Sequence, residues 1–243
     1  MERSGVSNLE NKNIVVVGGT SGIGLATAVL ASAAGANVWA VSRSADKVAN
    51  CQKQYPNITF SSCDTHDTGG LAELFAGVGR VDHIVAAATG ANRTMKPFLE
   101  QTQDQFREAF DKFWGYCNVV RAGATHLTES GSITLVSGTP ARKCNVGMSS
   151  VSCVGSAVEG LCRALALELA PLRVNVVAPG LIESGMQDHF GDKKADVLAQ
   201  MGKGVLLQRV GKSEEVASAI LLTLTNHYMT GTTLDVDGGL LLP

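Results

Sequence analysis

The chain has 243 residues, with 20 basic and 22 acidic side chains and a net charge of −2. This balance excludes a protein that binds nucleic acid through charge, because phosphate contacts require a clustered excess of Lys and Arg. Apolar residues make up 45% of the chain, so it is not disordered, and it is long enough to bury the core of one domain. Only 17% of its residues are charged and 27 are glycine, which favours buried elements joined by tight turns.

No segment predicts a membrane span or a signal peptide. The 30 residues from Asn13 to Ser42 carry no charge, but glycine and hydroxyl residues interrupt every 18-residue window, and no basic segment precedes it. The six cysteines form no CxxC pair and the five histidines no HxxxH set, so we expect no metal site. Reduced thiols and the absence of a signal favour a cytoplasmic protein.

Short apolar runs alternate with helical patterns along the chain. Several runs are continuous, as in parallel strands that are covered on both faces. The predicted strands are 14–17, 38–41, 58–61, 83–87, 132–136, 173–177 and 233–236. Helical spacing predicts helices over 23–34, 102–127, 152–169 and 213–224. The sequence therefore predicts an α/β fold with a doubly wound, seven-stranded parallel sheet and helices on both faces.

The chain predicts one domain over residues 9–243, preceded by a flexible tail at 1–8. An irregular insertion at 185–207 is the predicted contact region for a small-molecule substrate. Its apolar and amphipathic candidates are Met186, His189, Phe190, Val197 and Met201. A surface helix without a substrate role is the other interpretation of this segment.

A glycine-rich turn follows the first predicted strand and precedes a helix. Gly18 allows a tight turn, Gly22 lets a pyrophosphate approach the backbone, and Gly24 allows close packing of helix on strand. The N–H groups of the helix N-terminus then face the anion. This context predicts a dinucleotide-binding Rossmann fold, whereas glycines that merely tighten a turn are the alternative. The cofactor residues predicted here are Gly18, Thr20, Ser21, Gly22, Ile23 and Gly24.

The end of the second strand indicates which dinucleotide is bound. An NAD site presents an acidic side chain about 20 residues after the glycines. Here the strand ends at Ser42, followed by Arg43 and Ser44, and the first carboxylate is Asp46. A guanidinium beside hydroxyls suits a 2′-phosphate, which an acid would repel. The sequence therefore favours NADP(H) over NAD(H), unless Arg43 is simply a solvated loop residue.

Several motifs in order resemble the short-chain dehydrogenase/reductase family over about residues 9–243. They are the turn at 18–24, Asp64, VDHIVAAATG at 81–90, GSITLVSG at 131–138, AVEGLCRALALELAPLRVNVVAPG at 157–180 and TGTTLDVDGG at 230–239. The resemblance implies that Asp64 and Thr65 flank the adenine and that 86–88, with Ala87 and Ala88, pass the adenosine ribose. It implies that Pro179, Gly180, Ile182 and Ser184 hold the nicotinamide end. It also implies a homodimer or homotetramer formed through the helices at 102–127 and 152–169.

The chain departs from the family in the residues for proton transfer. Members use an Asn, a Ser and a Tyr-x-x-x-Lys pair, in which the tyrosine protonates the carbonyl oxygen. Threading the motifs puts these four positions on Lys112, Gly138, Val151 and Gly155. The chain has tyrosine only at 55, 116 and 228, so no shift in register supplies the usual donor.

The missing donor restricts the chemistry. Reduction of a ketone places negative charge on oxygen, which needs an acid or an oxyanion hole. An iminium carbon is already cationic and is neutralised by hydride, so it needs positioning and a cofactor. The sequence thus predicts an NADP(H)-dependent reductase of an imine, an iminium or another pre-activated bond. It also resembles a divergent fungal branch of the family in alkaloid and other specialised metabolism, where reduction is coupled to cyclisation such as an intramolecular Diels–Alder reaction.

The candidates for catalytic roles lie near the vacated positions and are Lys112, Ser137, Thr139 and Arg142. Lys112 would orient a carbonyl or repel a cation, the two hydroxyls would donate to a substrate carbonyl, and Arg142 would clamp an amide or carboxylate. Ordinary surface and capping roles remain open for all four. Two other functions also remain open: a non-redox isomerase or cyclase on this scaffold, and a catalytically silent NADP-binding protein.

Overall fold

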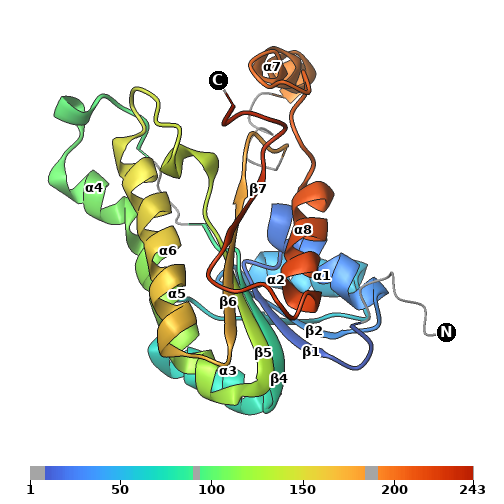
Figure 1. Cartoon of the computed structure of the whole chain (residues 1–243). Helices are drawn as coiled ribbons and strands as arrows, with labels where there is room; N and C mark the ends of the chain where they lie inside the picture. Colours follow the sequence, from blue (N-terminus) through green and yellow to red (C-terminus); the bar gives the residue numbers. More distant parts are fainter. Residues whose placement is uncertain (1–8, 90–93, 184–190, 243) are drawn as a thin grey trace.

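The computed structural model describes residues 9–89, 94–183 and 191–242. The predictions for the tail at 1–8 and for Ser184, Met186, His189 and Phe190 lie outside these residues. The described strands form a seven-stranded, fully parallel sheet in the order β3-β2-β1-β4-β5-β6-β7 (Figure 1). The predicted doubly wound α/β fold is therefore confirmed.

The strands are β1 Asn13–Val17, β2 Asn37–Ser42, β3 Thr59–Ser62, β4 Val81–Ala86, β5 Leu127–Val136, β6 Arg173–Pro179 and β7 Thr233–Val236. The helices are α1 Gly22–Ala33, α2 Ala45–Gln54, α3 Thr68–Val78, α4 Gln103–Ala109, α5 Asp111–Gly123, α6 Ser149–Glu168, α7 Lys194–Gly202 and α8 Ser213–Thr225. Short 3₁₀ turns lie at η1 Phe98–Glu100, η2 Ala124–His126 and η3 Thr139–Ala141.

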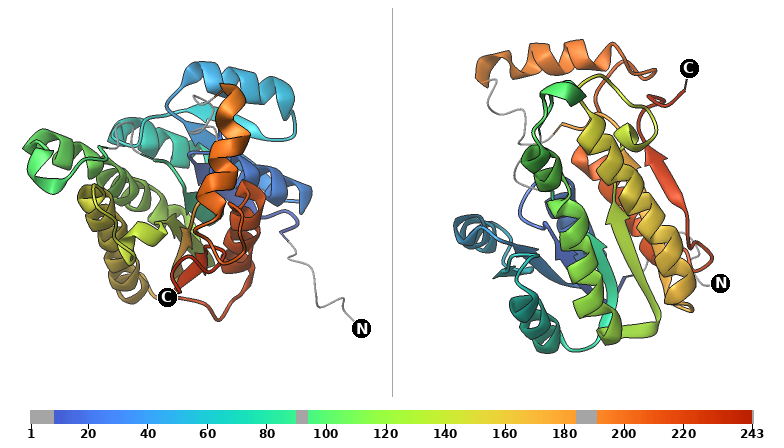
Figure 2. Two further views of the ribbon diagram at one scale, coloured as in Figure 1. Left: turned by 90° about the horizontal axis from the view of Figure 1, so that it is seen from above. Right: turned by 90° about the vertical axis from the view of Figure 1, so that its left-hand side faces the viewer.

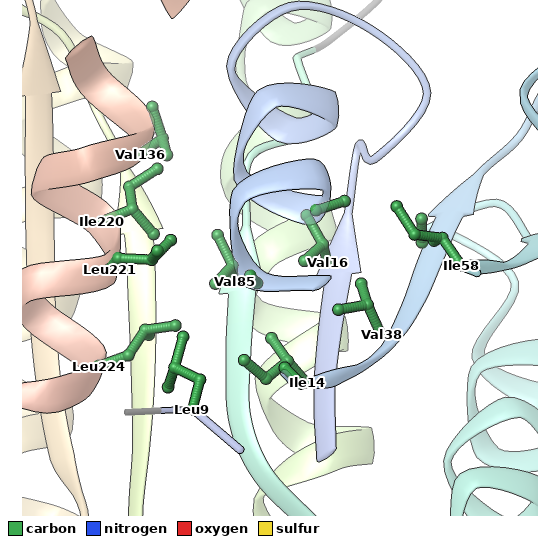
Figure 3. Close-up of a cluster of buried hydrophobic side chains, with 14 of the residues drawn as sticks. Leu9, Ile14, Val16, Val38, Ile58, Val85, Val136, Ile220, Leu221 and Leu224 are labelled. Atoms are coloured by element: carbon green, nitrogen blue, oxygen red, sulfur yellow. The ribbon is translucent and has the colours of Figure 1, made fainter. Parts of the chain in front are cut away.

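Both faces of the sheet are buried, which explains the continuous apolar strands. On one face α1, α2 and α8 pack over the sheet, with Ile14, Val16 and Ile220 in the core (Figure 3). On the other face α3, α5 and α6 lie side by side, with Phe75 and Tyr116 among the buried residues (Figures 1 and 2). Because each strand contributes side chains to both layers, period-two alternation is absent.

The single helix predicted over 102–127 is wrong. The chain forms α4, which begins at a capping box between Thr102 and Gln105, then breaks at Phe110 and continues as α5. From Leu127 onward it is strand, because Leu127 pairs with Val81 of β4. Apolar residues keep helical spacing across the break: the ring of Phe110 contacts that of Phe106 on one side and that of Phe113 on the other. Spacing alone therefore does not reveal it.

The insertion at 185–207 is also more regular than predicted, because Lys194–Gly202 forms α7. This helix lies across the end of the molecule where the strand carboxyl ends meet (Figure 2). Val197 and Met201 are part of it and are half-buried.

Among the described helices, α6 is long and apolar enough to cross a membrane by length and composition. Its Val154, Val158 and Cys162 are buried, and the latter two belong to the core layer over the sheet. One face of α6 therefore packs on the sheet. All six cysteines are free thiols, and no group of three metal-ligating side chains occurs within the described ranges.

His83 in β4 is a buried titratable group whose pKa makes stability depend on pH. It is 4% exposed, and its Nδ1 lies 2.8 Å from the hydroxyl of Ser132. Burial lowers the pKa of His83 from 6.5 to about 4. The folded protein thus holds this imidazole neutral at a pH where the unfolded chain protonates it.

We expect His83 to make the free energy of unfolding fall as pH drops from about 6.5 to about 4. A shift of about 2.5 units corresponds to about 3 kcal/mol, and this contribution is fully present above pH 6.5. Urea unfolding at several pH values should show a flatter profile for His83→Asn. The exposed His66→Asn is the control, and an unchanged profile in His83→Asn would refute the assignment.

Candidate active site

The predicted cofactor residues gather at one edge of the sheet. Since all strands are parallel, their carboxyl ends meet there, and the strand order reverses between β1 and β4. In open α/β sheets this reversal creates the crevice in which ligands bind. The turn after β1, the end of β2 and the end of β4 therefore surround one site.

The glycine turn has the predicted geometry. Gly18 has φ +89°, and the N–H groups of Gly18 and Gly19 donate to the carbonyl of Val41 at 2.7 and 3.1 Å. A Cβ atom on Gly18 would lie 2.5 Å from the nitrogen of Ala88, and one on Gly24 would collide with the carbonyl of Gly18. The sequence missed Gly19, where a Cβ would lie 2.7 Å from that of Ala40.

The N-terminus of α1 fits a pyrophosphate. Its first turn contains no acidic residue, and the N-cap Ser21 makes no side-chain capping bond. Thr20 is buried and its carbonyl accepts a bond from the thiol of Cys51, while Ile23 packs on the core. The backbone donors of this turn thus lack the side-chain acceptor that normally satisfies them.

Arg43 is exposed at the end of β2, beside the glycine turn, and no ion pair to it occurs within the described part of the chain. Ser42 is the last residue of β2, and Ser44 caps α2 by accepting from the N–H of Lys47 at 3.4 Å. A guanidinium at the start of a helix suits a phosphate group.

The predicted adenosine residues lie on the loops after β3 and β4. Asp64 accepts from the N–H of His66 at 2.9 Å, which fixes the turn. Thr65 packs against α5: a Cβ atom on Gly115 would lie 2.5 Å from the hydroxyl oxygen of Thr65. The backbone carbonyl of Thr65 also accepts a hydrogen bond from the side chain of Asn118 at 3.0 Å. Ala87 donates its N–H to Val17 at 2.8 Å and so extends β4 toward the glycine turn.

On the nicotinamide side, the end of β6 is held by the chain that follows β7. Gly180 donates to Val236 at 3.0 Å, and a Cβ on it would lie 2.7 Å from the Cα of Asp237. Pro179 ends β6, and Ile182 forms an isolated bridge with Gly211. An open pocket of about 620 Å³, here called the cavity, lies beside this bridge. Its lining includes Glu183, Lys194 and Leu198 on one side and residues 208–210 on the other.

The position of the family lysine is filled by protein. On α6, Val151, Gly155 and Glu159 follow one another at four-residue spacing and share a face. A Cβ on Gly155 would lie 2.9 Å from the Cβ of Ala141 in η3. The η3 turn therefore packs directly onto α6 where a lysine side chain would begin.

Lys112 and Ser137, which the sequence places near the vacated asparagine and serine positions, meet at the end of β5. The ammonium of Lys112 donates to the carbonyl of Ser137 at 3.3 Å and lies 5.5 Å from the centre of the Tyr116 ring. The hydroxyl of Ser137 donates to Glu159 at 3.1 Å. Its proton is thus directed at a buried carboxylate, and the predicted donation from Ser137 to a substrate carbonyl is not the arrangement observed.

The prediction that Arg142 clamps a substrate amide or carboxylate is also not the arrangement observed, because Arg142 is paired with protein carboxylates. Its guanidinium binds both carboxylate oxygens of Asp235, and its Nε lies 3.4 Å from Glu159. The hydrogen bond to Asp235 raises the pKa of Arg142. Thr139 is 3% exposed, and its carbonyl accepts from the N–H groups of Arg142 and Lys143 at 3.0 and 2.9 Å. The sequence missed Glu159 and Asp235 as partners of Arg142, because the motifs at 157–180 and 230–239 that contain them do not indicate this pairing.

Comparison with known proteins extends these observations. Residues 17–241 match a family model described as enoyl-(acyl carrier protein) reductase. The short-chain dehydrogenase/reductase malC of Malbranchea aurantiaca is 32% identical over 96% of each chain. The 3-oxoacyl-[acyl-carrier-protein] reductase of Rattus norvegicus is 32% identical over 96% of this chain and 99% of the relative.

Two solved structures are similar throughout. The MalC reductase/Diels-Alderase of Malbranchea aurantiaca has a TM-score of 0.88 at 30% identity, over 98% of this chain and 99% of that one. An NADPH-bound short chain oxidoreductase of Pseudomonas aeruginosa, described as containing an atypical catalytic center, has a TM-score of 0.87 at 29% identity. The latter match covers 95% of this chain and 98% of that one.

The contact between η3 and α6 predicts that even one added methyl group at Gly155 lowers the stability of the protein. Gly155→Ala gains about 1 kcal/mol of helix propensity but overpacks against Ala141 at a cost of about 1–3 kcal/mol. The two effects together predict a net loss of up to about 2 kcal/mol in the free energy of unfolding, measured by urea denaturation. Gly77→Ala in α3, where a Cβ would meet open space, is the control and should lose nothing. Equal stability of the two variants would contradict the packing.

Proposed function

We infer a function from one premise: the chain belongs to the short-chain dehydrogenase/reductase family. It is an oxidoreductase that uses NADP(H). We propose that it reduces an imine, an iminium or another pre-activated double bond of a small molecule in specialised metabolism. The observation that carries this proposal is the combination of a glycine turn shaped for a dinucleotide with a lysine position filled by Ala141.

The residues described above fit the cofactor. The uncapped N-terminus of α1 would bind the pyrophosphate, Arg43 the 2′-phosphate, and Pro179 to Ile182 the nicotinamide end. The cofactor supplies a hydride when bound. Ser184, also assigned to the nicotinamide end, lies outside the described residues.

The chain's own residues then define which acceptors are suitable. Val151 and Gly155 present no acid, and the proton of Ser137 is directed at Glu159. A substrate carbon that is already electron-poor needs no proton at the moment of hydride transfer. We assign Lys112 the role of fixing the end of β5 through the Ser137 carbonyl, beside the reacting centre.

Coupling of reduction to a cyclisation is a second element of the proposal. It is supported by the similarity to a protein named as a reductase/Diels-Alderase over nearly the whole chain. Such a step requires a shaped cavity that holds the substrate in a reactive conformation, and the cavity beside α7 offers about 620 Å³.

Assembly as a homodimer or homotetramer belongs to the same proposal. Trp114 of α5 is 53% exposed and Leu167 of α6 is 82% exposed. Large apolar side chains on the outer faces of these two helices are consistent with cover by further copies of the chain.

The reaction type is tested by following NADPH absorbance with a panel of cyclic N-methyl iminium salts and their ketone counterparts. We expect oxidation with iminium compounds and none with the ketones, because positions 151 and 155 carry no acid and the Ser137 proton is directed at Glu159. No oxidation with any iminium salt, in a protein that binds NADPH, would refute the reductase. Product formed without oxidation of NADPH would instead favour an isomerase or cyclase. NADPH binding without any turnover would favour a catalytically silent NADP-binding protein.

The cofactor assignment has its own test. Arg43→Asp removes the guanidinium and adds a charge that repels the 2′-phosphate, so the dissociation constant for NADPH should rise about tenfold or more. That for NADH should change less than about threefold. Titration by NAD(P)H fluorescence measures both constants, and Lys53→Asp on α2 controls for the change in net charge. Equal weakening of the two cofactors would contradict the assignment.

A further inference from the structure

The segment after β7, Asp237–Leu242, forms a compact turn, here called the strap. The carboxylate of Asp237 accepts from the N–H groups of Gly239 and Leu241 at 2.9 and 2.8 Å. Gly238 and Gly239 both have positive φ, +64° and +85°, which glycine adopts without strain. The strap therefore has a fixed shape of its own.

One side of the strap is held by η3 and the residues that follow it. The ammonium of Lys143 donates to the carbonyls of Leu240 and Leu242 at 2.6 and 3.5 Å. Its neighbour Arg142 binds Asp235, two residues before the strap, and also Glu159 of α6. Two consecutive cations thus fasten this part of the chain to the same turn that fills the lysine position.

The other side of the strap holds the chain between α7 and the cavity. The N–H of Leu207 donates to the carbonyl of Gly238 at 3.2 Å. A Cβ on Gly238 would lie 2.7 Å from Val205, and one on Gly239 would lie 2.8 Å from Leu206. Residues 205–207 link α7 to Gln208, which lines the cavity together with α7 residues. Figure 1 shows the end of the chain next to α7.

We propose that Lys143 is a positioning residue for substrate binding. By holding the strap on η3, it fixes Val205–Leu207 and with them the wall of the cavity beside α7. Lys143 itself need not touch the substrate. The inference rests on the proposed function, because it takes this cavity as the substrate site. Substrate affinity then depends on hydrogen bonds from Lys143 to carbonyls 97 and 99 residues later in the sequence.

The test compares Lys143→Met with the wild-type protein and with Lys53→Met, an exposed lysine of α2. Loss of a charge-assisted bond predicts that the KM for a cyclic N-methyl iminium salt rises about tenfold, while kcat and the NADPH dissociation constant change less than threefold. Hydrogen exchange of peptides covering residues 203–210 should accelerate, and that of β1 and α1 should not. Lys143→Arg should restore both values, since a guanidinium also donates to carbonyls.

Unchanged exchange at 203–210, or equal acceleration throughout the protein, would overturn the positioning role. A KM that stays constant while exchange at 203–210 rises would also overturn it, because the cavity wall would then not bind the substrate. If wild-type protein reduces no iminium salt, the proposed function fails. Exchange then still decides whether Lys143 holds residues 205–207, so the two failures are distinguishable.

Discussion

At Gly18 the chain turns so close to the end of β4 that a Cβ atom would lie 2.5 Å from the nitrogen of Ala88. This approach aligns three loops at the point where the strand order reverses, and it points the N-terminus of α1 into the crevice between them. Gly24 lets α1 pack against the same turn. Cofactor binding and the packing of the first strand and helix therefore depend on the same few backbone atoms.

The charge-free stretch from Asn13 to Ser42 follows from this arrangement. It supplies a strand covered on both faces, a turn at the start of α1 whose backbone donors we propose bind a phosphate, a helix in the core and a second covered strand. A carboxylate in the turn would compete with a phosphate for those donors. The first charge after the stretch is Arg43, at the end of β2.

The sequence predicted the sheet well because each strand carries its own signal. Continuous apolar runs and the glycine turn are local patterns, and they placed six of the seven strands within about two residues. The exception is β5, which begins at Leu127, five residues before its predicted start. The break at Phe110 was missed, because aromatic residues in mutual contact preserve helical spacing through it. The partners of Arg142 were missed for another reason. Asp235 is 93 residues away and Glu159 lies on another helix, and such pairs arise only from tertiary packing.

The contact of Gly155 with Ala141 also bears on how this chain can change. A tyrosine at position 151 would need one substitution, but a lysine at 155 would begin inside the η3 turn. That turn is itself fastened by Arg142 to Asp235 and Glu159. Recovery of the family's proton-donating pair thus requires coordinated changes on a helix, a turn and a strand. A lysine introduced alone at position 155 would clash with Ala141 and lower the stability of the protein. The packing of η3 on α6 therefore opposes a stepwise return to the family pair.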